Sequence, residues 1–190
     1  YQALIRAALT PSSKRLELLH KANEAYPAFF LAPFEYADEL FHRGPEYGHP
    51  RIEAKIPLET TVRLRPKFGP GWEHLLWLFL SEGDSAQAGA ALDSLERTPP
   101  PEPGFSGALR TMLLLGYHWR FLAPDSAEVF SRAVLSDPRI RSNQDASAGA
   151  RLMMTADAPR GAVRLGRLLE EGSSGNADLI TGGLLGQLLG

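Results

Sequence analysis

The sequence predicts an all-α fold in which antiparallel helix pairs stack into a solenoid. Apolar residues recur at helical spacing along most of the chain, and Val and Ile are scarce beside Leu and Ala, which disfavours a sheet. Four prolines divide the chain at intervals of 39, 34 and 38 residues, each after a stretch patterned as two amphipathic helices: Pro27, Pro66, Pro100 and Pro138. A recurrence of about 20–50 residues is typical of stacked repeats, which usually hold partners rather than perform chemistry.

The composition is ordinary for a packed, soluble protein. Of the 190 residues, 44% are hydrophobic, which is too apolar for a disordered chain. The net charge of −2 gives no attraction to nucleic acid, so no nucleic-acid partner is expected. The absence of cysteine excludes disulfides and thiolate metal sites and agrees with a reducing compartment, so we expect a cytoplasmic protein. No apolar run reaches the roughly 18–20 residues that a transmembrane segment needs.

Both ends of the chain have the pattern of a fragment. The chain begins at Tyr1 without a methionine, and residues 180–190 form an apolar helical pattern with no stop signal. We therefore expect the chain to be part of a larger bacterial protein. Any membrane association would come from the other parts of that protein.

About 10–11 helices are predicted, and apolar rows mark the faces that should be buried. The predicted helices cover residues 1–9, 12–26, 30–43, 50–64, 70–82, 84–97, 106–122, 125–136, 143–156, 158–171 and 177–189. The apolar rows are Leu16, Leu19, Ala22 and Tyr26; Ile52, Ile56, Val62 and Leu64; Trp72, Leu75, Leu76, Phe79 and Leu80; and Val163, Leu165, Leu168 and Leu169.

Capping signals and loop lengths support these boundaries. Asp84 and Asp125 are each followed three residues later by Gln or Glu, the arrangement in which the cap accepts a backbone N–H and the later side chain reaches back. Pro159 stands in the expected first turn of a later helix, where its missing N–H costs nothing. The two longer loops, 43–50 and 98–104, are too short to separate domains, so residues 1–190 are predicted to form one solenoid domain.

Three stretches of the chain carry a common pattern of aromatic, small and apolar residues. The clearest places an aromatic, Leu, a second aromatic, small residues and a closing proline in order at Trp72, Leu75, Phe79, Gly83, Ala88, Leu92 and Pro100. The next unit has Leu113, Tyr117, Phe130, Ala133 and Pro138. The preceding unit has Tyr36, Ala37, Leu40, Ala54, Leu58 and Pro66, if the 43–50 loop holds about five extra residues.

This pattern resembles the tetratricopeptide repeat. The resemblance implies a right-handed solenoid whose best-matching core is residues 30–138, with diverged helix pairs at 1–29 and 139–190. In the family, the first helix of each pair lines a concave groove that binds a peptide or a helix. Leu76 and Leu95 stand where the family has small residues, so the helices are expected to pack less closely there.

The resemblance implies a set of groove residues that mixes aromatic, histidine and acidic side chains, as interface hot spots often do. They are Phe34, Glu35, Asp38, Phe41, His42, Glu73, His74, Trp77, Met112, Leu115, His118 and Trp119. The alternative is that several of them pack inside the superhelix. The expected function is a non-catalytic module that binds a protein or peptide partner within a larger signalling or regulatory protein.

No catalytic, cofactor or metal site is predicted. His42 and His49 flank Glu46 in the longer loop near residues 43–50, but ligands spaced in a loop are weak evidence for zinc, and a solvated loop is favoured. Glu73-His74 lacks the second histidine of a zincin helix, and no nucleophile elbow or phosphate loop occurs. Two alternatives remain open: a structural subunit of a large assembly, and an all-helical enzyme with acids and histidines in a central cavity.

Overall fold

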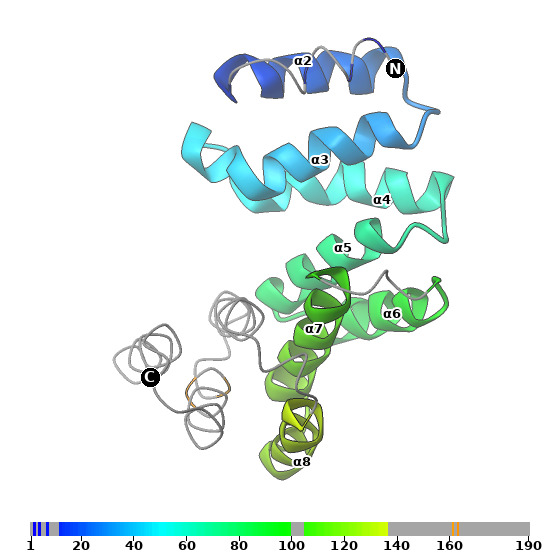
Figure 1. The fold of residues 1–190 in the computed structure, drawn as a ribbon. Coiled ribbons are helices and arrows are strands. Elements are labelled where there is room, and N and C mark those ends of the chain that lie inside the picture. Colours follow the sequence, from blue (N-terminus) through cyan, green and yellow to red (C-terminus); the bar gives the residue numbers. More distant parts are fainter. Residues whose placement is uncertain are drawn as a thin grey trace. The chain divides into compact units, whose positions relative to one another are not determined.

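The protein is helical in every part that the computed structural model describes (Figure 1), namely residues 12–99 and 105–136 and the single positions 2, 4, 7, 161 and 163. Within these residues there is no strand, which confirms the predicted all-α class. The predicted helices over 143–156 and 177–189, and most of those over 1–9 and 158–171, lie outside the described residues. Among the helices that are described, none has the length and apolar character needed to cross a membrane.

The helices begin and end within one residue of the predicted bounds. The predicted helix over 50–64 starts with a 3-10 turn before it becomes α-helical. The elements are α2 (Ser12–Ala25), α3 (Leu31–Arg43), the 3-10 helices η1 (Gly44–Tyr47) and η2 (Arg51–Ala54), α4 (Lys55–Leu64), α5 (Gly69–Glu82), α6 (Ser85–Glu96), α7 (Phe105–Phe121) and α8 (Pro124–Leu135).

The chain divides into two compact units. The first contains residues 1–78 and 93–99, and the second contains residues 79–92 and 100–190, so α5 and α6 contribute to both. A single domain over residues 1–190 stays a prediction.

The core of the first unit is built on α3, which lies against α2 on one side and α4 on the other (Figure 1). On α2, α3 and α4, buried apolar side chains lie three or four residues apart, as one helix face requires. The core includes Leu16, Leu19 and Ala22 of α2; Ala37, Leu40 and Phe41 of α3; Ala54, Leu58 and Val62 of η2 and α4; and Leu75, Leu76 and Leu78 of α5. The predicted faces of α2 and α5 are therefore largely confirmed, although Tyr26 is exposed.

The predicted buried face of α4 was wrong at Ile52 and Ile56 and right at Val62, which is buried. Ile56 is 74% exposed and Ile52 is 40% exposed, whereas Ala54 and Leu58 are fully buried. One face of the helix carries the buried residues at four-residue spacing: Ala54, Leu58 and Val62. The sequence pattern did not reveal this row because Ala54, its first residue, is small. The two isoleucines consequently leave apolar surface open to solvent.

Two contacts fix α3 and α5 in the first unit. The buried carboxylate of Glu39 on α3 lies 3.1 Å from Nε of Arg15 on α2. Gly71 in the first turn of α5 lies so close to α4 that an added Cβ would be 2.8 Å from Cγ1 of Val62. Only glycine allows this approach of the two helices.

The 43–50 segment is an ordered turn in which η1 follows α3 directly. Gly48 has a φ of 83°, a left-handed conformation that favours glycine, and the His49 N–H donates to the carbonyl oxygen of Gly44 at 2.9 Å. Because α3 continues to Arg43, His42 belongs to its last helical turn and not to the loop.

The second unit is organised by α7 and α8. Met112, Leu113 and Leu115 of α7 are fully buried, as is Ala127 of α8. The His118 ring stacks on the Phe130 ring with centroids 4.0 Å apart and planes within 5°. These contacts join the two helices through apolar and aromatic surface.

The two predicted capping sites have different outcomes. Asp84 caps α6, since the Gln87 backbone N–H donates to its Oδ1 at 2.9 Å. The Gln87 side-chain amide donates to the other carboxylate oxygen at 2.8 Å and does not reach back to the backbone. The cap predicted at Asp125 was wrong: α8 begins one residue earlier with Pro124, so Asp125 lies inside the first turn. Pro159 lies outside the described residues.

Candidate functional site

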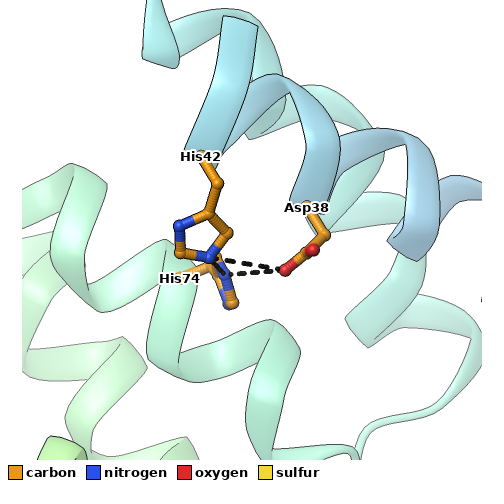
Figure 2. A group of neighbouring side chains, drawn as sticks. All are labelled: Asp38, His42 and His74. Atoms are coloured by element: carbon orange, nitrogen blue, oxygen red, sulfur yellow. Dashed lines mark hydrogen bonds and ion pairs between the residues drawn. The ribbon is translucent and has the colours of Figure 1, made fainter. Parts of the chain in front are cut away.

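Asp38, His42 and His74 form a cluster between α3 and α5 (Figure 2). Asp38 and His42 lie on one face of α3 because they are four residues apart, which is about one helical turn. His74 comes from the first half of α5. One ligand-type atom from each of the three side chains lies within 4.8 Å of the other two.

Three atoms of this cluster are at mutual contact distance. His42 Nε2 and His74 Nε2 are 3.1 Å apart. Oδ1 of Asp38 lies 3.2 Å from His74 Nε2 and 3.5 Å from His42 Nε2. Two imidazole nitrogens and one carboxylate oxygen thus face a common point.

A hydrogen bond to the backbone fixes the orientation of the His74 ring. Its Nδ1 lies 2.7 Å from the carbonyl oxygen of Pro70, one turn earlier on α5. A carbonyl oxygen can only accept, so Nδ1 carries the hydrogen and donates it. In the neutral ring, Nε2 therefore presents a lone pair to Asp38 and His42.

Aromatic rings enclose one side of the cluster. The ring of the buried Phe41 lies with its centroid 4.8 Å from that of His74 and 5.2 Å from that of Trp77, and Phe34 is 5.9 Å from His74. His74 is consequently only 12% exposed, whereas His42 is 54% exposed and Asp38 is 37% exposed. The cluster has a dry side made by rings and a side that solvent reaches.

The charge states follow from burial and from the neighbours. Burial would raise the pKa of Asp38, but the hydrogen bond that a protonated His74 donates, together with the positive charges that His74 and His42 carry when protonated, outweighs it and lowers this pKa. Burial lowers the pKa of His42, and the charges of His74 and Arg51 add to this effect against the attraction of Asp38. At neutral pH, Asp38 is therefore a carboxylate and His42 a neutral base.

Glu35 adds a further acid on α3 beside this cluster. It is half-buried, and burial together with the negative charges of Asp38 and Glu39 raises its pKa, against the opposing charge of Arg15. Glu73 on α5 is only 5% exposed, so its carboxyl group faces the protein and not an open surface.

The twelve predicted groove residues divide between the two units. Six side chains of the first unit come together around the cluster: Phe34, Asp38, Phe41, His42, His74 and Trp77. Phe41 is buried among them, and in the second unit Met112 and Leu115 are fully buried, so these three offer no open surface. One groove running through both units stays a prediction.

His118 and Trp119 are partly exposed and make contacts inside the second unit. His118 stacks on Phe130, as described above, and burial lowers its pKa. The Trp119 indole N–H donates to Oγ of Ser131 at 2.9 Å, and the buried Ser131 hydroxyl donates to the carbonyl oxygen of Ala127 at 2.7 Å.

The loop residues considered for zinc are not gathered into a site. His49 Nδ1 lies 2.9 Å from Oε2 of Glu53, and Glu46 pairs with Arg43 at 3.5 Å. His42 instead faces His74 on another helix. The signal that could have found the cluster is the four-residue spacing of Asp38 and His42, read together with the expected proximity of α3 and α5.

Comparisons with protein-family models, curated proteins and solved structures give no match to this chain. The geometry of the described residues must therefore carry the argument for function.

Proposed function

We propose that this chain is a non-catalytic protein-interaction module, a tetratricopeptide-like solenoid that binds a peptide or helix on the α3–α5 face. We define this face by the partly exposed side chains of Phe34, Asp38, His42 and Trp77. The single observation that carries the proposal is that α3 and α5, the first helices of adjacent pairs, meet through the residues expected to line a groove.

The chemistry of the face suits a peptide partner. Trp77 and Phe34 supply apolar ring surface, while Asp38 and His42 supply a carboxylate and an imidazole beside it. Aromatic anchors surrounded by polar groups are the usual centres of binding energy in interfaces. The rings are already packed against Phe41 and His74, so binding costs little side-chain ordering.

A second candidate is a structural subunit of a larger assembly, and the exposed Ile52 and Ile56 favour it. They lie on η2 and α4 and present apolar side chains to solvent at 40% and 74% exposure. Such a patch would be covered in a permanent complex. The surface around Ile52 and Ile56 shares no residue with the α3–α5 face.

Peptide selection on the immobilised chain, followed by affinity measurement on the selected peptide, tests the proposal. Trp77→Ala should weaken binding about 30-fold, the effect of a 2 kcal/mol hot spot, because it removes the central ring. Ile56→Ala removes an exposed apolar side chain elsewhere in the same unit and is the matched control. Its affinity should stay within about twofold of the unchanged chain.

The opposite pattern would support the second candidate. Loss of binding in Ile56→Ala with full binding in Trp77→Ala would remove the α3–α5 face from consideration. Circular dichroism of both variants should retain the helical signal, since neither side chain is among the fully buried residues.

A further inference from the structure

We propose that Asp38, His42 and His74 bind one divalent transition-metal ion of the Zn²⁺ class. The inference does not rest on the proposed partner binding, because the site is complete within the first unit and is tested with the metal alone. Among the described residues, these three form a group of histidine and acidic side chains whose donor atoms converge.

The spacing of the three donor atoms fits a metal centre. Zinc bonds of about 2.0–2.1 Å at the tetrahedral angle place neighbouring donor atoms roughly 3.3 Å apart. The observed separations are 3.1, 3.2 and 3.5 Å. One ion at the common point can therefore reach all three atoms with small side-chain adjustments.

The donor types select the class of metal. Two imidazole nitrogens and one carboxylate oxygen suit zinc and neighbouring transition metals. Mg²⁺ and Ca²⁺ prefer oxygen donors, which make up only one of the three donors here. The cluster should therefore discriminate strongly against Mg²⁺.

The hydrogen bond on the far side of the His74 ring supports the same assignment. The Nδ1–H of His74 donates to the Pro70 carbonyl oxygen at 2.7 Å, as the outer nitrogen of a metal-bound histidine usually does. This bond directs the Nε2 lone pair of the neutral ring toward Oδ1 of Asp38, which also carries only lone pairs. A metal ion between the two can take the place of the proton that joins Asp38 to a charged His74, and it binds both atoms.

The site also has an entry path and an open position. His42 is 54% exposed, so the ion can reach the cluster from solvent without unfolding of the helices. Three protein ligands leave the fourth tetrahedral position for water or for a donor from another molecule. The rings of Phe41 and Phe34 lie against the less exposed ligand, His74.

Isothermal titration of the full chain, without a histidine tag, with ZnCl₂ tests the inference. We expect one ion per chain and a melting temperature that rises with zinc concentration. His42→Ala should weaken zinc binding by about 100-fold or more, because it removes a side chain that binds the ion directly. MgCl₂ should give no saturable signal.

His49→Ala is the matched control, since His49 is a similarly exposed histidine of the same unit that pairs with Glu53 outside the cluster. It should bind zinc as the unchanged chain does. His42 is on the surface and its removal should not unfold α3, while Asp38→Asn keeps the side-chain shape and should also weaken binding. Absence of stoichiometric zinc binding, or equal binding by His42→Ala and the unchanged chain, would overturn the proposal.

Discussion

The two units use the same kinds of side chain in different ways. In the first unit, His42 and His74 face each other and Asp38. The ring of Phe41 packs against His74, while His42 is exposed to solvent. In the second unit, His118 lies flat on Phe130, and Trp119 is tied to Ser131 of α8. The sequence predicts one groove that contains Asp38, His42, His74, His118 and Trp119.

The difference lies in what the facing helix provides. α3 presents two polar side chains one turn apart to His74, so donor atoms converge. α8 presents the Phe130 ring to His118 and a hydroxyl to Trp119, so the histidine and the indole are used for packing. The role of a residue in a helical array therefore depends on its neighbour as much as on its own position.

The largest expected effect in this comparison is that of Trp119→Ala. It should lower the free energy of unfolding by about 3 kcal/mol, because it removes a large ring and its hydrogen bond to the buried Ser131. Urea unfolding of the full chain followed by circular dichroism measures this loss. A loss of less than about 1 kcal/mol would contradict the packing role of Trp119.

Two glycine substitutions compare the helix contacts of the two units. Gly71→Ala should cost about 1–2 kcal/mol, since its Cβ would be 2.8 Å from Val62 and would push the start of α5 away from α4. It should also weaken zinc binding, because Pro70 and His74 lie on the displaced turn.

Gly89→Ala in α6 should have the opposite effect. The added Cβ would meet only Tyr117 Oη at 3.4 Å, so the substitution should stabilise the helix by about 0.5–1 kcal/mol. Thermal unfolding of both variants measures the contrast, and a neutral Gly71→Ala would contradict the close packing.

The smallest expected effect is the pH dependence that His118 gives the second unit. Burial lowers the pKa of His118 in the folded state from the ordinary value of 6.5, so the folded state favours the neutral ring. As the pH falls through 6.5, the unfolded chain takes up the proton first and stability decreases; above 6.5 the residue has no effect. His118→Gln should therefore show a shallower fall in melting temperature between about pH 7.5 and 5.5. An unchanged slope would mean that His118 is not held in its neutral form.

The sequence predicted the helices well because their ends carry local signals. Pro66 and Gly83, together with the capping residue Asp84, stop or start helices through backbone geometry and one side-chain bond. These signals act over a few residues and need no tertiary information. The face of α4 was mispredicted because apolar character alone pointed to Ile52 and Ile56, while packing selected the row beginning at Ala54.

The cluster could be predicted only in part. The sequence showed Asp38 and His42 on one helix face and His74 in the first helix of the next pair. It could not show that the three donor atoms converge within a few ångströms, because this depends on how closely α3 and α5 approach. Contacts between helices, such as that of Gly71 with Val62, set the approach, and they have no local signature.

Proton NMR of the histidine rings during zinc addition tests the central claim most directly. The chain has 5 histidines, so each ring can be assigned from single substitutions. We predict that the signals of His42 and His74 change until one equivalent of zinc is bound, while those of His20, His49 and His118 stay in place. Signals of His42 and His74 that remain unchanged, or that change no more than that of His118, would contradict the account.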